Sequence, residues 1–511
     1  MARYEQFLTN TAANVIFRLF SACLGLILTP LFVRRLGTEA YAIWVLNLTI
    51  INYFYLMEGS CGGAIVKHVA EAEATNDKAE LASVVQTALA VYGVFGLVVF
   101  AVTMGCGHWL LAPFYRGSPH HQTAANLLSI SGLAAIIMWP SLVFPSVLRG
   151  QLRFVTLNWI QGVGALLTQL VVIGAVTWGA RLEVVALGFY CASMVTTIAL
   201  LWAVGQRMRG WRPSAKFMDR ALFVRILRFS SGLFLLELLS MLGYQSDRLI
   251  IAYFLPLSAV TTYDVVTKMF YVLRSIYGSL LGVIEPLVFA ASRRQDLAFV
   301  GQMAVKGTKI VTVVYTPVIV LGMVVAGPFL KTWMGGEYAR YGYWSALYIS
   351  HYLLPPIVGV IGTVAIGMSR LRAMQRLSAM AVLLNVAISV AGVKMFGFEG
   401  ALVGTVTSSY LFVAIAYVVY CRTVGIAWRA PIRENALSLA ILIGVFLAPG
   451  IWCAPFIVQG WWSLAAFVGG FLIAEYVVLF WTALDRSERT RLLTYAIGKG
   501  IGGLAMRDRS S

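Results

Sequence analysis

The sequence has few charged residues. Asp, Glu, Lys and Arg make up 12% of its 511 residues, about half the share found in soluble domains. Hydrophobic residues make up 60%, and the mean hydropathy is +0.82. Because a transmembrane helix needs ~20 apolar residues, the chain has room for about fourteen of them and little else. We therefore predict an all-α polytopic membrane protein and exclude a soluble one.

Residue patterns that carry catalysis or bind metals are also missing. The six cysteines are scattered singly, and no pair has the spacing of a metal or redox site. There is no GxxxxGK[ST] motif to bind a nucleotide, no nucleophile elbow and no pair of catalytic carboxylates. His120 and His121 are adjacent, so on a helix they would point apart. We predict no enzymatic activity, no cofactor and no bound metal.

The net charge of +18 would suit a nucleic-acid partner, but its distribution favours a membrane explanation. If the N-terminus is cytoplasmic, 28 of the 39 Lys and Arg residues fall in inner segments. The densest of these segments runs from Arg207 to Arg228. The positive-inside rule accounts for this bias and predicts that both termini are cytoplasmic. No nucleic-acid partner is needed.

Hydrophobic spans and loops divide the chain into five parts. We predict a six-helix bundle over 1–206, a basic cytoplasmic linker over 207–228, a second six-helix bundle over 229–424, two additional transmembrane helices over 425–484 and a cytoplasmic tail over 485–511. Shifting the chain by 219 residues lays Leu36–Trp44 on Leu255–Tyr263. The bundles would therefore form a parallel repeat. The linker is predicted to form a helix lying on an anionic membrane face, and Gly397–Gly404 a tight outer turn.

Ionisable residues inside the predicted spans are the candidate functional residues. A charge at mid-bilayer costs at least ~2.5 kcal/mol, so such residues usually face a bundle interior or a wet cavity. Most lie in Phe229–Arg294, where two spans meet at Pro256. The cations are candidates for binding a phosphate group: Arg18, Arg248, Lys268 and Arg274. The carboxylates are candidates for ion coupling: Glu58, Glu237, Asp247 and Asp264.

Two purely structural interpretations of these ions stay open. Asp264 and Lys268 are four residues apart on one helix and could neutralise each other. Arg18 could pair with Glu237 across the two halves. At 100° per residue, Glu237, Met241, Tyr244 and Arg248 of the span before Pro256 fall within an arc of about 60°, whereas Asp247 lies about 100° away from Arg248.

Four residues on either side of the turn at Pro256 form a pattern: Asp247 and Arg248 in the stretch SDRLIIAYFL, and Tyr263 and Lys268 in the stretch YDVVTKMF. This pattern resembles helices seven and eight of the Wzx-type polysaccharide flippases, members of the multidrug/oligosaccharidyl-lipid/polysaccharide exporter superfamily. The resemblance implies two six-helix bundles around a central cavity that opens alternately to each side. It implies a bacterial inner-membrane protein whose substrate is an undecaprenyl-pyrophosphate-linked oligosaccharide, moved to the periplasmic leaflet. Membrane lipids, a polysaccharide polymerase and glycosyltransferases would be its partners.

The main alternative is a cation-coupled drug exporter of the multidrug and toxin extrusion type. Such exporters are similar in fold but usually have twelve spans and acidic residues facing the cavity. Here the first span carries Arg18 instead. A lipid II flippase and a non-transporting membrane scaffold also remain open at this point.

Overall fold

The computed structural model describes residues 25–115, 119–206, 208, 218–293, 301–368 and 371–490, and leaves out the side chains of 57–60, 229–233, 236, 283–287, 289–293, 367 and 371–373. All secondary structure in these residues is helical. The chain forms two compact units. Unit 1 comprises Met1–Ile276 and Arg372–Ser409, and unit 2 comprises Tyr277–Leu371 and Tyr410–Ser511. These limits differ from the predicted bundle boundaries, so the six-plus-six repeat stays a prediction.

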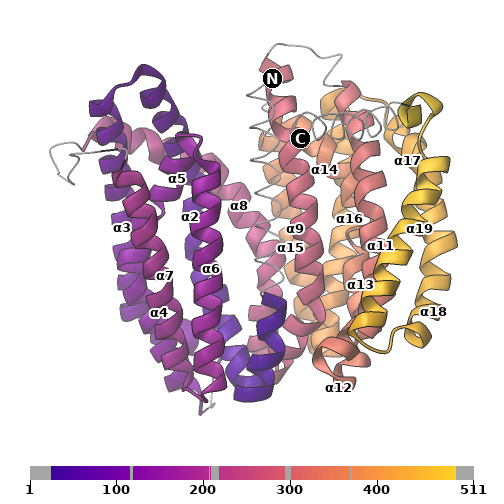
Figure 1. The fold of residues 1–511 in the computed structure, drawn as a ribbon, viewed down its shortest axis with the longest axis horizontal. Helices are drawn as coiled ribbons and strands as arrows, with labels where there is room; N and C mark the ends of the chain where they lie inside the picture. The colour runs from indigo at the N-terminus through magenta and orange to yellow at the C-terminus, as the bar shows by residue number, and fades with distance from the viewer. Residues whose placement is uncertain are drawn as a thin grey trace, which may run out of the picture. The chain divides into compact units, whose positions relative to one another are not determined.

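The first described helix of unit 1 covers residues 25–36. Its other helices are α2 (Thr38–Thr75), α3 (Lys78–Leu111), α4 (His121–Ser141), α5 (Val143–Gly150), α6 (Phe154–Thr177), α7 (Leu182–Gly205), α8 (Arg220–Phe254), the first part of α9 (Leu257–Arg293), most of α15 (Leu371–Phe396) and the start of α16 (Phe398–Val424). In Figure 1, α3 packs beside α4, and α6 beside α7. The predicted turn at Pro256 is confirmed, since it separates α8 from α9.

Aspartates mark the start of two of these helices. Asp77 accepts hydrogen bonds from the backbone N–H groups of Ala79 and Glu80, both at 2.9 Å, and so caps α3. Asp219 caps α8 in the same way. Because α8 starts at Arg220, residues 220–228 continue directly into the predicted span that ends before Pro256. The helix predicted for this part of the linker is therefore present but continuous with α8, and its position on the membrane face stays a prediction.

Glycines set the turn and the close packing of α15 and α16. Gly397 alone separates the two helices, with a φ of +69° that a glycine adopts at little cost. The predicted turn over Gly397–Gly404 is therefore too long, since Phe398 is already helical. A Cβ on Gly400 would lie only 2.0 Å from the carbonyl oxygen of Gly392. Glycine at both positions lets the two backbones approach closely, as in other membrane helix pairs.

Unit 2 contains the end of α9, the end of α16 and the helices that remain. These are η2 (Met303–Gly307), α11 (Thr308–Met334), α12 (Gly336–Ala339), α13 (Gly342–Ser350), α14 (Pro355–Gly367), α17 (Arg429–Ile441), η3 (Leu442–Leu447), α18 (Ala448–Ile457) and α19 (Trp461–Thr482). The nearly buried Lys309 of α11 donates to Glu488 at 2.8 Å. This ion pair fixes the chain after α19 against the start of α11.

Within the described residues, ten helices are long and apolar enough to cross a membrane, or eleven if the bent pair Thr38–Leu56 and Cys61–Thr75 counts as one span. Many large apolar side chains on these helices are exposed, such as Val163 on α6, Ile198 on α7 and Ile473 on α19. Lipid can cover such surfaces without cost. The chain is thus a multi-pass membrane protein, and fourteen spans stay consistent with it.

Candidate functional site

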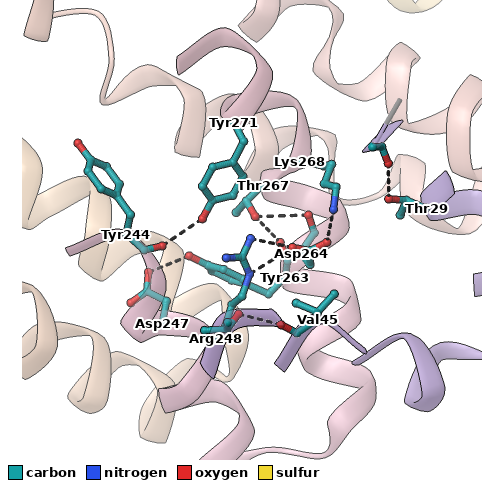
Figure 2. A network of polar contacts seen from close by, with 12 residues as sticks. Thr29, Val45, Tyr244, Asp247, Arg248, Tyr263, Asp264, Thr267, Lys268 and Tyr271 are labelled. Atoms are coloured by element: carbon teal, nitrogen blue, oxygen red, sulfur yellow. Dashed lines mark hydrogen bonds and ion pairs between the residues drawn. The ribbon is translucent and has the colours of Figure 1, made fainter. Parts of the chain in front are cut away.

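Asp264 lies at the centre of a buried ion cluster in unit 1 (Figure 2). Its Oδ1 accepts hydrogen bonds from Arg248 Nε at 3.2 Å and Nη2 at 2.8 Å. Its Oδ2 accepts from Lys268 Nζ at 2.9 Å and from Tyr41 Oη at 2.7 Å. One carboxylate on α9 therefore holds a cation from α8, a cation from its own helix and a phenol from α2. Such charge-assisted bonds are shorter and stronger than neutral ones.

Hydrogen bonds also connect two stretches that correspond to each other in the predicted repeat. Thr261 Oγ1 donates to the backbone carbonyl of Thr38 at 2.5 Å, and Tyr41 bonds to Asp264. Each of these contacts joins the stretch after Leu36 to the stretch after Leu255, the two segments that the sequence shift superposes. The N-terminal parts of α2 and α9 are therefore hydrogen-bonded to each other within unit 1.

Asp247, one residue before Arg248, is the centre of a second polar cluster. Its Oδ2 accepts from Tyr263 Oη at 2.8 Å and from Thr405 Oγ1 at 2.5 Å. Asn385 of α15 donates to Thr405 Oγ1 at 3.0 Å. The carboxylate is buried, and its Oδ1 has no hydrogen-bond partner among the described residues. Three helices, α8, α9 and α16, thus enclose a carboxylate that no described cation pairs with at short range.

A cavity of about 380 Å³ lies beside the Asp264 cluster within unit 1. Its lining residues come from α2, α8 and α9, and are Leu56, Glu237, Ser240, Met241, Tyr244, Gln245, Arg248, Tyr271 and Arg274. The guanidinium carbon of Arg274 lies 3.7 Å from the centre of the Tyr244 ring, and that of Arg248 lies 4.9 Å from the centre of the Tyr271 ring. Aromatic faces stabilise cations in this arrangement.

Hydrogen bonds within unit 1 hold the Arg248 side chain in place at the cavity wall. Asp264 binds Arg248 through two of its nitrogens, and Tyr271 Oη donates to the Tyr244 backbone carbonyl at 3.1 Å. These contacts fix the guanidinium group of Arg248 and the Tyr271 ring against which it lies. The cavity wall then combines two cations with one carboxylate, Glu237, and several neutral hydrogen-bonding groups. It can bind an anionic group that accepts hydrogen bonds.

Six of the eight predicted candidates have described side chains. Arg248, Arg274 and Glu237 line the cavity, whereas Lys268 binds Asp264 and Tyr41. The expected i,i+4 contact between Asp264 and Lys268 is present. Asp247 has its own cluster. Arg18 and the side chain of Glu58 lie outside the described residues, so the Arg18–Glu237 pair stays a prediction. The roles of all eight residues in binding or coupling stay predictions as well.

Helical periodicity alone did not single out the partners on other helices. Tyr41, Thr405 and Asn385 are uncharged, and they lie far in the chain from the carboxylates that they reach. Their only sequence signal is a polar side chain within an apolar span. Among the described residues, no group of three or more His, Cys, Asp or Glu side chains could hold a metal ion.

Comparison with known proteins identifies a matching family and solved structures of similar fold. The family described as "Polysaccharide biosynthesis protein" matches residues 7–292. No curated protein sequence matches the chain.

Three solved structures illustrate the similarity in fold. An inward-facing multidrug-resistance MATE family transporter of the MOP superfamily has a TM-score of 0.66 and 13% identity, over 80% of this chain and 98% of that one. The lipid II flippase MurJ in an inward closed conformation also has a TM-score of 0.66, with 14% identity over 91% and 96%. A MOP superfamily transporter from Pyrococcus furiosus, whose binding pocket is described as reversed in polarity, has a TM-score of 0.62 and 13% identity over 81% and 95%. At these identities the similarity shows the fold alone.

Proposed function

This chain belongs to the polysaccharide biosynthesis protein family, and from that premise we propose that it is a lipid-linked oligosaccharide flippase. Its substrate would be an undecaprenyl-pyrophosphate-linked oligosaccharide, moved from the cytoplasmic to the periplasmic leaflet for surface or exopolysaccharide synthesis. The reaction is transport, with no covalent chemistry. Alternating access of a cation-lined cavity would carry the headgroup across the membrane.

The observation that carries this proposal is the pair of arginines in the cavity of unit 1. A pyrophosphate carries at least two negative charges and cannot cross hydrocarbon unaided. Arg248 and Arg274 line the cavity from two helices, each against a tyrosine ring. Arginine binds phosphate oxygens through a planar fork of donors. We assign substrate binding to Arg248 and Arg274 first, with Arg18 and Lys268 as further members of the path.

Lys268 and Arg248 together keep a positive charge that they can offer the headgroup. Both contact Asp264, so one carboxylate is shared between two cations. The cluster of these three groups keeps one positive charge in excess. Asp264 would therefore act as a positioning residue that orients Arg248, more than as a coupling group.

Asp247 is the coupling residue that the geometry favours. It is buried, and one of its oxygens has no hydrogen-bond partner among the described residues. An unpaired charge in such surroundings is costly, so binding and release of a proton would change the energy of the Asp247 cluster. Because Asp247 precedes Arg248 in α8, a shift of that helix would move both residues. Glu58 and Glu237 remain the other coupling candidates.

The proposed location is the bacterial inner membrane with both termini in the cytoplasm, as the Lys and Arg distribution indicates. Glycosyltransferases that build the lipid-linked substrate and a polymerase that consumes it are the proposed partners. A multidrug exporter is the second candidate, since a MATE transporter shares the fold. The two cavity arginines favour an anionic substrate over the cationic drugs that such an exporter would carry.

The test is transport by the purified chain in proteoliposomes. The probe is a fluorescent polyprenyl-pyrophosphate-linked N-acetylglucosamine, and dithionite quenching reports the fraction exposed on the outer leaflet. A charge-assisted hydrogen bond contributes ~1.5–3 kcal/mol, so Arg274→Ala should slow flipping roughly 10- to 100-fold. Arg340→Ala is the matched control, because Arg340 also lies against a tyrosine ring but is exposed in an outer connection.

Two results would overturn the proposal. One is a flipping rate no faster than in protein-free vesicles, together with transport of the cationic dye ethidium. That pattern would identify a drug exporter. The other is normal flipping by a well-folded Arg248→Ala/Arg274→Ala variant, which would exclude these arginines as the headgroup site.

A further inference from the structure

A second cavity, of about 440 Å³, lies at one end of unit 1. Among the described residues four polar side chains line it: Glu73 near the end of α2, Gln151 and Arg153 between α5 and α6, and Gln206 after α7. All four lie at connections that the predicted topology places in the cytoplasm. The volume falls within the range of small-molecule sites, and none of the residues takes part in the Asp264 or Asp247 cluster.

A strained backbone position brings two of these side chains to the same cavity. Leu152, between Gln151 and Arg153, has a φ of +57°, which is uncommon for a residue with a side chain. In a continuous helix, residues two apart point about 200° away from each other. Here Arg153 N–H donates to the Leu148 carbonyl at 2.9 Å, so the chain turns between them. The Leu152 side chain is 66% exposed. It therefore gains little from burial that could offset the strain of its backbone conformation.

Hydrogen bonds hold the two side chains in position at the cavity wall. Gln151 Nε2 donates to Glu73 Oε1 at 2.7 Å, and Arg153 Nη1 donates to the Ala203 carbonyl at 3.0 Å. The first bond connects the turn to α2, and the second connects it to α7. Gln151 Oε1 is buried without a partner among the described residues. This leaves an acceptor that a donor on a ligand could satisfy.

The four side chains that line this cavity indicate which class of ligand it can bind. Glu73 and Arg153 cancel in charge, and two amides add both donors and acceptors. A phosphate would meet the Glu73 carboxylate as well as the arginine, and a lipophilic drug would find no apolar side chain among the described lining residues. A sugar ring carries no charge, and each of its hydroxyls both donates and accepts. We infer that this cavity binds a neutral sugar ring.

This inference concerns a site separate from the proposed headgroup cavity and does not depend on transport. The sugar could be free or attached to a lipid. Both sources share the same ring chemistry, so the test uses both forms. The probes are five monosaccharides (glucose, galactose, mannose, rhamnose and N-acetylglucosamine) and their octyl glycosides. The full chain is placed in nanodiscs of phosphatidylethanolamine and phosphatidylglycerol, which contain no sugar.

Saturation-transfer NMR measures binding of each probe. We expect at least one sugar to show transfer that Gln206→Ala weakens about 2- to 10-fold and Arg153→Ala about 10-fold or more, the effects of losing one neutral or one charged hydrogen bond. Gln206 is exposed, and its side chain makes no described hydrogen bond to another helix. Its replacement should therefore leave the fold intact. Gln459→Ala, at an exposed glutamine in the α18–α19 connection, is the matched control and should not change binding.

The outcomes separate clearly. Transfer to the octyl glycosides alone, lost in both cavity variants, would identify a lipid-attached sugar as the ligand. Transfer to the free sugars with the same loss would identify soluble sugar. No transfer to any probe, transfer unchanged in Gln206→Ala and Arg153→Ala, or binding of inorganic pyrophosphate in place of sugar would each overturn the inference. A failed flipping assay would leave this result standing, because binding is measured without transport.

Discussion

Replacing Asp264 with alanine should destabilise the protein severely, because it removes the only described carboxylate that contacts Arg248 and Lys268. Asp264 is 1% exposed and accepts four hydrogen bonds, three of them from the two cations. Removing one partner of a buried ion pair costs about 3–5 kcal/mol. Two cations would lose their partner here, so we expect a loss at the upper end of that range.

The free energy of unfolding can be measured by titrating SDS into dodecyl maltoside micelles and following circular dichroism. Lys268→Ala should lower the free energy of unfolding by less than Asp264→Ala does, because Asp264 keeps its contact with Arg248. The double variant Asp264→Ala/Lys268→Ala should be more stable than Asp264→Ala, since one uncompensated cation is gone. Neighbouring sites that share a partner are expected to be non-additive in this way.

Asp485→Ala supplies a matched control for the loss of a carboxylate near a lysine. Asp485 lies 3.8 Å from Lys309, and its side chain is 79% exposed, so it should contribute no more than about 1 kcal/mol. If the free energy of unfolding of Asp264→Ala is within about 1 kcal/mol of that of the unaltered protein, the ion cluster is not what holds α8, α9 and α2 together. An equal loss in Asp264→Ala and in the double variant would also refute the shared-carboxylate reasoning.

Three other predictions follow from the sequence and the structure. Leu152→Gly should raise the free energy of unfolding by about 1 kcal/mol, because glycine relieves the left-handed backbone conformation; a lower thermal midpoint would contradict this. Asp247→Asn should abolish the part of transport that depends on a proton gradient while substrate binding persists; a variant that still responds to the gradient would exclude Asp247 as the coupling residue. Reporter fusions after Ser118 and Ser510 should report periplasm and cytoplasm respectively, and a periplasmic Ser510 fusion would contradict the fourteen-span topology.

The fold class could be predicted from the sequence because the membrane imposes simple constraints. Apolar runs of sufficient length predicted the membrane helices, and ten of the described helices, or eleven with the bent pair, are long and apolar enough to be such spans. The α8–α9 turn was predictable because Pro256 interrupts the helix. The length of the turn at Gly397 was overestimated, since a single glycine with positive φ suffices there. Asp219 is a residue type that often precedes a helix, but we predicted that this span starts at Phe229, whereas α8 begins at Arg220.

The sequence by itself determined the membrane class and the i,i+4 spacing that allows the Asp264–Lys268 contact. That contact lies within one helix, where residues four apart are always neighbours. Only the tertiary structure decided which helices meet. Tyr41 reaches Asp264 across 223 residues of chain, and Thr405 reaches Asp247 across 158. Helical periodicity gives the face on which a side chain lies but not the helix that packs against that face, so these partners and both cavities emerge only when the helices are packed.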